Sequence, residues 1–238
     1  MLAARRTDRL ERLVAELTAD GARALAVRCD VTVDGDPERA VAAARERFGA
    51  LDVVVANAGF GVVGPVALLT VDDFRRQFET NVFGVLRTVY ASLPDVRRRR
   101  GRIAIIGSVS GHIAAPGSSP YAMSKFAVRA LAEALGHELA RSGASVTLVS
   151  PGYVASEIRS VDNQGVHRAE TRDPVPKFLI MSTERAARQI VRAIARRRRE
   201  VVVTGHGKAI VFLHRHAPWL TTAVIRTFGV RSRAEPKS

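Results

Sequence analysis

Two neighbouring segments are the most informative about the fold, Gly107-Ser108-Val109-Ser110-Gly111 and Tyr121-Ala122-Met123-Ser124-Lys125. Ser108 follows a short apolar run that predicts a strand, while Tyr121 and Lys125 lie four residues apart in a predicted helix and therefore share one face. An ammonium beside a phenol favours the phenolate and draws the tyrosine pKa, ordinarily about 10, towards neutral pH. A serine hydroxyl next to them can hold a carbonyl oxygen. Together the three side chains suit protonation of an oxygen while a hydride reaches its carbon.

Further motifs flank this stretch in a fixed order: Asp30-Val31, Asn57-Ala58-Gly59, Asn81-Val82-Phe83-Gly84 and Pro151-Gly152. A tyrosine and a lysine at this spacing are, taken alone, just as well explained as a pair on a helix surface. With the other motifs, however, the sequence resembles the short-chain dehydrogenase/reductase (SDR) family over about residues 1–205. The resemblance implies an α/β fold, a Rossmann-like doubly wound parallel sheet with helices on both faces. We expect residues 1–205 to form a dinucleotide-binding catalytic domain and residues 206–238 an apolar and basic C-terminal extension.

The family resemblance also points to something that this sequence lacks. Relatives begin with a strand and a turn of the type Thr-Gly-x-x-x-Gly-x-Gly, whose backbone amides hold the cofactor pyrophosphate. This sequence begins inside what resembles the second strand, and Gly59, Gly61 and Gly64 are no substitute because they follow a later one. Loss of the first strand leaves ladder groups on both neighbouring strands unpaired. Either the start codon is assigned too late, which we favour, or the chain is a true truncation with little cofactor affinity.

The resemblance assigns catalytic roles to four residues. Tyr121 is the general acid/base and Ser108 holds the substrate oxygen. Lys125 lowers the tyrosine pKa and hydrogen-bonds the nicotinamide ribose, and Asn81 anchors a water that connects Lys125 to solvent. Each has a structural alternative: Asn81 as a polar residue satisfied by backbone groups, and Ser108 as a turn residue.

The same resemblance assigns cofactor contacts, which Tyr121 and Lys125 share. Asp30 contacts the adenine amino group and Val31 packs on the ring. The loop Asn57, Ala58 and Gly59 supports the adenosine ribose, and the loop Pro151 and Gly152 flanks the nicotinamide. No metal site is predicted.

Cofactor preference depends on the end of the second strand, where relatives that prefer NAD carry an acid. Here Ala4 takes that position and Arg5 and Arg6 follow it. Arginine side chains suit a 2′-phosphate, so we predict NADP, with NAD less favoured. The alternative is a solvated arginine pair in front of a helix.

The composition fits one soluble α/β domain, with 238 residues of which 47% are hydrophobic. A single cysteine, no secretory signal at the charged start and no long apolar run favour a cytoplasmic protein. The net charge of +14 is compatible with nucleic acid, a membrane surface or an anionic cofactor, and equally with an arginine-rich genome composition. The arginine runs 97–100 and 196–199 are expected at helix ends, and nucleic-acid binding is not predicted because no aromatic residues interleave with them.

Apolar spacing along the chain predicts alternating strands and helices. The first helix is expected to have Thr7 or Asp8 as its N-cap. Strands are expected at 1–4, 24–28, 51–56, 103–106, 146–149 and 201–203, and helices from about 7 to 21, 37 to 48, 74 to 93, 121 to 142 and 183 to 198.

The remaining segments indicate less about function. Residues 156–181 lie where the family places its substrate lid, and their mixed composition suits an apolar alcohol or ketone without selecting one. His112 and His167 are candidates for the pocket wall, although such histidines more often face solvent. Residues 209–228 are open to three readings: a packed terminal helix, an oligomer contact, or an amphipathic strip giving peripheral membrane contact.

The leading prediction is therefore an oxidoreductase that moves a hydride between NADP(H) and a secondary alcohol, ketone or aldehyde. The resemblance further implies a homo-oligomer. The alternative function is a truncated, catalytically silent chain that acts as a binding or regulatory partner.

Overall fold

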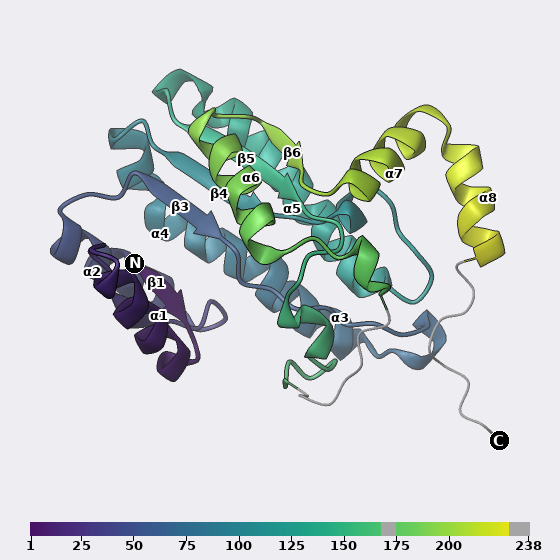
Figure 1. Ribbon diagram of the computed structural model, residues 1–238, viewed down its shortest axis with the longest axis horizontal. Helices are drawn as coiled ribbons and strands as arrows, with labels where there is room; N and C mark the ends of the chain where they lie inside the picture. The colour runs from purple at the N-terminus through teal and green to yellow at the C-terminus, as the bar shows by residue number, and fades with distance from the viewer. Residues whose placement is uncertain (168–174, 229–238) are drawn as a thin grey trace.

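A computed structural model describes residues 1–167 and 175–228 of the chain. Parallel strands alternate with helices along it, as Figure 1 shows. The elements in order are β1 (Leu2–Ala4), α1 (Thr7–Ala19), β2 (Ala26–Arg28), α2 (Asp36–Phe48), β3 (Val53–Ala56), α3 (Val71–Phe78), α4 (Gly84–Arg98), β4 (Arg102–Ile106), α5 (Ser119–Leu139), β5 (Ser145–Ser150), α6 (Thr183–Ala195), β6 (Glu200–Val202), α7 (Gly205–His216) and α8 (Pro218–Phe228).

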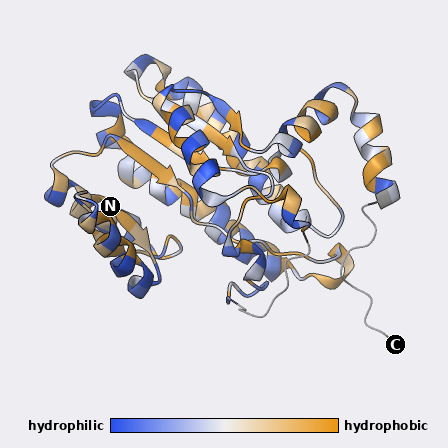
Figure 2. Ribbon diagram, in the orientation of Figure 1, coloured by the Kyte–Doolittle hydropathy of each residue, from blue (hydrophilic) through white to orange (hydrophobic). Residues whose placement is uncertain are grey.

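The larger sheet has the order β3-β4-β5-β6, all parallel. Helices α4 and α5 cover one face and α6 covers the other, so the sheet is buried between helical layers (Figure 1). Its strands are largely hydrophobic (Figure 2), as expected when both faces are covered. Ile103 and Ile105 of β4 are fully buried, together with Val128 and Leu139 of α5. The predicted α/β fold with parallel strands and helices on both faces is confirmed.

Strands β1 and β2 form a separate parallel pair on which α1 packs, and α2 packs against α4. Among the described residues no strand bridges β1 and β3. Val53 and Val55 of β3 are 42% and 47% exposed although they are apolar and belong to a strand. The strand predicted at residues 1–4 is confirmed by β1, whereas a family strand and glycine-rich turn missing before it stay a prediction.

Two local predictions differ from the structure. The N-cap of α1 is Arg6, without a side-chain hydrogen bond, because Asp8 lies within the first turn and pairs with Arg12 instead. The helix predicted from 74 to 93 consists of α3 and α4 joined by a π-helical turn, Glu79–Phe83. A π-turn holds one residue more than an α-turn and is frequent at functional sites.

The arginine runs lie at helix ends, as predicted: α4 ends at Arg98, and α6 ends just before Arg196. Arg197 also has a structural task, because its guanidinium donates to the backbone oxygens of Arg100 (2.7 Å) and Gly143 (2.8 Å). Within the described ranges, none of the helices combines the length and the apolar character needed to cross a bilayer.

Candidate active site

The candidate residues gather where the strands of the larger sheet end. Ser108 follows β4 and Pro151 follows β5, while Asn57 follows β3. Helix α5 supplies Tyr121 and Lys125. Carboxyl ends of parallel strands are where ligands bind in sheets of this kind. The sheet therefore brings together residues that are far apart in the sequence.

The Ser108 hydroxyl lies close enough to Tyr121 to influence the pKa of the phenol. Burial raises the pKa of Tyr121 above its usual value, while the Ser108 side chain and the charge of Arg159 act in the opposite direction. Ser108 Oγ also accepts a hydrogen bond from Ser110 N at 3.0 Å, which fixes its rotamer at the start of a short 3-10 turn. The sequence offered no signal for Arg159, which lies in the expected lid and has no motif around it.

Lys125 is almost completely buried, and burial lowers its pKa to about 8. Its Nζ donates to Ile106 O at 2.9 Å and lies 5.6 Å from the centroid of the Tyr121 ring. The effect of this ammonium on the Tyr121 pKa stays a prediction. The Tyr121 pKa is raised overall, because burial outweighs the opposing effects of Ser108 and Arg159. The Lys125 ammonium donates its hydrogen bond to the backbone carbonyl of Ile106.

Asn81 lies in the π-turn and is fully buried. Its Oδ1 accepts from Phe60 N at 3.1 Å, and its Nδ2 donates to Phe60 O at 3.0 Å and to Ser124 Oγ at 3.1 Å. The structural alternative, an asparagine satisfied by backbone groups, is thus confirmed, and the water-mediated role stays a prediction. A Cβ at Gly59 lies 3.1 Å from Asn81 Oδ1 and 3.7 Å from Lys125 Nζ, so only glycine fits without displacement.

Gln77 is a buried residue of this region that sequence reasoning missed. It accepts a hydrogen bond from Val62 N at 2.6 Å and donates to Phe60 O at 2.8 Å. Gln77 and Asn81 together fix the loop that follows Gly59. Their four-residue spacing was the available signal, because polar residues on the apolar face of a helix need partners.

The loop after β5 is held by the start of α7. Gly152 packs against Thr204 and His206, and a Cβ there lies 2.5 Å from His206 Nε2. His206 Nε2 accepts from Tyr153 N at 3.0 Å, and the two rings stack 5.2 Å apart. Burial lowers the pKa of His206. Sequence reasoning assigned this histidine to the extension 206–238 and gave it no part in the site.

The predicted nucleotide contacts follow β1, β2 and β3 and are mostly exposed. Asp30 Oδ1 accepts from Thr32 N (3.0 Å) and Thr32 Oγ1 (2.8 Å). Burial works to raise the pKa of Asp30, but these hydrogen bonds and the charge of Arg5 lower it overall. The Val31 side chain packs against the backbone of Gly84, and Asn57 and Ala58 are exposed.

The two arginines predicted to bind a phosphate are not equivalent. Arg5 is exposed, but Arg6 Nη2 lies 2.9 Å from Glu157 Oε2. Arg9 Nη1, which sequence reasoning missed, lies 2.5 Å from Glu157 Oε1. Hydrogen bonds from Arg9 and Arg6 lower the pKa of Glu157 to about 2. An ion-pair cluster therefore joins α1 to the expected lid.

The two histidines considered for the pocket lie in different surroundings: His167 is exposed, as such histidines more often are, and His112 is not. His112 is buried rather than facing solvent, and its Nε2 lies 3.1 Å from Ser150 Oγ and 3.0 Å from Glu200 Oε1. His167 Nε2 lies 3.8 Å from Glu157 Oε2, outside the group around Tyr121. Residues 168–174 of the expected lid lie outside the described residues. The lid segment before them contacts the loop after β3, because the Asn163 side chain exchanges two hydrogen bonds with the backbone of Val63.

The chain is similar to known proteins along most of its length. Residues 1–166 match the family model described as short chain dehydrogenase. Dehydrogenase/reductase SDR family member 7B of Bos taurus is 32% identical over 255 residues, covering 100% of this chain and 75% of that protein. The chain spans 57% to 65% of the length of three further curated oxidoreductases that it matches.

Two solved structures cover most of the chain. An alcohol dehydrogenase from the archaeon Thermococcus sibiricus, complexed with 5-hydroxy-NADP, aligns with a TM-score of 0.73 at 26% identity and covers 85% of this chain and 84% of that one. An SDR from Burkholderia phymatum in complex with NAD aligns with a TM-score of 0.74 at 27% identity, covering 100% and 88%. By sequence and by fold, this chain belongs to the short-chain dehydrogenase/reductase family of oxidoreductases.

Proposed function

We propose that this protein transfers a hydride between NADP(H) and a secondary alcohol, ketone or aldehyde, with Tyr121 as general acid/base. The observation that carries the proposal is the meeting of three side chains: the Ser108 hydroxyl acts on the Tyr121 phenol, and the buried ammonium of Lys125 lies 5.6 Å from the Tyr121 ring centroid. A phenol, a hydroxyl and an amine in one place have no evident structural reason to be together. They do provide a proton donor, an oxygen-binding group and a nearby positive charge.

In the reducing direction, Tyr121 gives its phenolic proton to the substrate oxygen, which Ser108 holds by hydrogen bonding. The nicotinamide supplies the hydride when it is bound. The phenolate left on Tyr121 is stabilised by the Ser108 hydroxyl and by the positive charges of Lys125 and Arg159. In the oxidising direction the same phenolate accepts the proton of the alcohol.

The residues present fit a nicotinamide ribose. Among the described residues, Lys125 Nζ has one hydrogen-bond acceptor, Ile106 O, and an ammonium has three N–H groups. Two donors are therefore left for ribose hydroxyls. Asn81 would hold the water that connects Lys125 to solvent, and Pro151 and Gly152 would flank the nicotinamide ring.

Cofactor preference is proposed from the basic residues at the end of β1. Arg6 and Arg9 already converge on two carboxylate oxygens of Glu157, which is an arrangement that suits a phosphate, and Arg5 beside them is exposed. Solved relatives bind either a 5-hydroxy-NADP or NAD. With Ala4 in place of an acid, we favour NADP, the adenosine lying along Asp30, Val31, Asn57, Ala58 and Gly59.

We also propose that residues 1–238 lack the family's first strand and glycine-rich turn. The division into two sheets and the half-exposed valines of β3 support this, because a strand placed between β1 and β3 would unite them. Adding such a segment from a relative should raise NADPH affinity. An unchanged affinity would count against a missing strand, without touching the role of Tyr121.

We also propose a homo-oligomer, because large apolar side chains are exposed on the helices that cover the sheet. They lie on the π-turn, α4 and α5: Phe83, Tyr90, Met123 and Phe126. Light scattering after size exclusion tests this, since Phe126→Glu should yield monomers. A wild-type protein that is monomeric at micromolar concentration removes the proposal.

The experiment that tests the enzymatic function compares two tyrosine variants. Tyr121→Phe should lower NADPH-dependent reduction of an accepted ketone by roughly a hundredfold or more, because the proton donor is lost. Tyr90→Phe, an exposed tyrosine on α4, is the matched control and should keep full activity. NADPH binding, followed by its fluorescence, should survive in both variants. Activity retained by Tyr121→Phe overturns the assigned role.

A further inference from the structure

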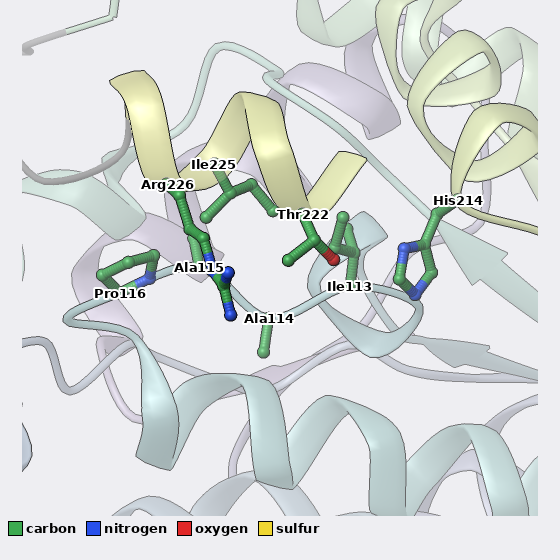
Figure 3. A pocket seen from close by; sticks show the side chains of 8 residues that line it. All are labelled: Ile113, Ala114, Ala115, Pro116, His214, Thr222, Ile225 and Arg226. Atoms are coloured by element: carbon green, nitrogen blue, oxygen red, sulfur yellow. The ribbon is translucent and has the colours of Figure 1, made fainter. Parts of the chain in front are cut away.

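Helices α7 and α8 form an arm that projects from the α/β body (Figure 1). The arm is anchored at its base: Thr204 Oγ1 accepts from Gly207 N at 3.2 Å, and Gly207 and Val211 are buried. After Ala217 the chain turns, and α8 returns towards the loop at residues 113–116 (Figure 3). The arm is therefore an ordered part of the molecule with two helices of exposed surface.

Large apolar side chains on this arm face solvent. Trp219 is 72% exposed and Phe212 is 66% exposed. Leu220 and Val224 are also exposed and, being four residues apart, share one face of α8. Single exposed apolar residues are ordinary, but a group of them on two consecutive helices marks an interaction surface.

The charge of the arm indicates what kind of partner binds this surface. Residues 205–228 contain Lys208, Arg215 and Arg226 and three histidines, but no aspartate or glutamate. None of these three cations forms an ion pair with a residue in the described ranges, in contrast to Arg6, Arg76 or Arg87. Arg215 helps to lower the pKa of the Glu200 carboxyl, but Lys208 and Arg226 have no acidic partner among the described residues, so the complementary partner is anionic.

A cleft beside the arm combines the same two chemical features. Its volume is about 400 Å³, and it lies between α8 and the loop from Ile113 to Pro116. Figure 3 shows apolar lining residues, among them Ile225, Ala114 and Ala115, with the Arg226 guanidinium extending among them. An apolar surface next to an unpaired guanidinium matches the boundary between lipid chains and phosphates.

We propose that the α7–α8 arm docks on the surface of an anionic lipid bilayer. Trp219, Phe212 and Val224 enter the boundary between headgroups and chains, where tryptophan is favoured, and Lys208 and Arg226 contact lipid phosphates. This inference goes beyond the oxidoreductase chemistry and does not depend on the cofactor assignment.

Flotation with vesicles tests the proposal directly. The full chain should float with vesicles of equal parts phosphatidylcholine and phosphatidylglycerol, and not with phosphatidylcholine alone. Trp219 is the only tryptophan, so its emission should shift to shorter wavelength on binding. The double variant Phe212→Ser, Trp219→Ser should float roughly tenfold less, and Arg226→Gln roughly fivefold less.

Two matched controls separate a local surface from general basicity. Arg198→Gln removes an exposed charge elsewhere, and Leu68→Ser removes an exposed apolar side chain elsewhere. Both should bind like the wild type. Equal losses in these controls, absence of binding to the anionic vesicles, or binding unchanged in the double variant overturns the proposal. A double variant that dissociates an oligomer, by light scattering without lipid, would instead assign the arm to contacts between copies.

Discussion

The predicted catalytic residues and part of the predicted cofactor contacts lie in different regions of the molecule. The first region is the four-stranded sheet with α5, which holds Ser108, Tyr121 and Lys125. The second is the separate strand pair β1 and β2, which Arg5, Arg6 and Asp30 follow. The first group is held by burial and by hydrogen bonds to backbone groups. The second group is exposed or half-buried, and ion pairs hold part of it.

The two groups should respond differently to substitution. When the partner of a buried polar group is removed, the group is left unsatisfied, and this costs its full desolvation penalty. Exposed ion pairs, in contrast, contribute little to the stability of the fold. Substitutions of Ser108, Tyr121 or Lys125 should therefore alter both activity and stability. Substitutions of Arg5, Arg6 or Asp30 should mainly alter ligand affinity.

The largest effect is expected from Lys125→Met, which should lower activity roughly a hundredfold. It should also remove a pH dependence of stability. The Lys125 pKa is about 8 in the folded protein, against about 10.4 when unfolded. Between these values the unfolded chain binds more protons, so wild-type stability rises with pH. Over that window the gain is about 3 kcal/mol.

Urea unfolding measured from pH 7 to above pH 10 checks this, and Lys208→Met on the exposed face of α7 is the control. The control should keep the wild-type rise, and Lys125→Met should flatten it. Parallel curves for all three proteins contradict the prediction.

Gly59→Ala should be next in size. The added methyl group meets Asn81 Oδ1 at 3.1 Å, so the asparagine or the loop must shift, at a cost of about 1–3 kcal/mol. Gly136→Ala in α5 is the matched control, because its nearest contact is 3.9 Å away and alanine favours helix. Thermal unfolding of the pair should give changes of opposite sign. A neutral Gly59→Ala would mean that this loop is not tightly packed.

His206→Ala should have a smaller effect. Tyr153 N loses its acceptor and the stacked ring is removed, which should destabilise the fold by about 1–2 kcal/mol. His137→Ala, an exposed histidine in α5, should be neutral. Chemical unfolding measures both. Equal midpoints would show that the contact between α7 and the loop after β5 contributes nothing.

Glu157→Gln should change stability least, by less than about 1 kcal/mol, because its ion pairs with Arg6 and Arg9 are exposed. It should raise affinity for 2′-AMP by up to about fivefold, since both guanidinium groups lose a competing carboxylate. Calorimetry in low salt measures this, with Asp72→Asn, which breaks the exposed pair to Arg75, as control. An unchanged affinity would remove Arg6 and Arg9 from the proposed phosphate site.

The sequence predicted the sheet and the positions of the catalytic candidates because both depend on local patterns. Ser108 follows an apolar strand, and the spacing of Tyr121 and Lys125 is set by one helix. The contacts that could not be predicted join distant segments: Glu157 lies 151 residues from Arg6, and His206 lies 53 residues from Tyr153. The π-turn was missed because Phe74, Phe78 and Val82 have a spacing that an uninterrupted α-helix satisfies equally well.

In the turn Glu79–Phe83, the number of residues matters as much for the structure as their identity. Deleting one residue from it would restore regular α-helical winding, and the backbone hydrogen bonds would close without loss. The same deletion would rotate everything before it by about 100° relative to α4. Gln77 and Asn81 could then no longer both face the loop at Phe60. Natural variants with a shortened turn should therefore be rare even though the helix itself would tolerate them.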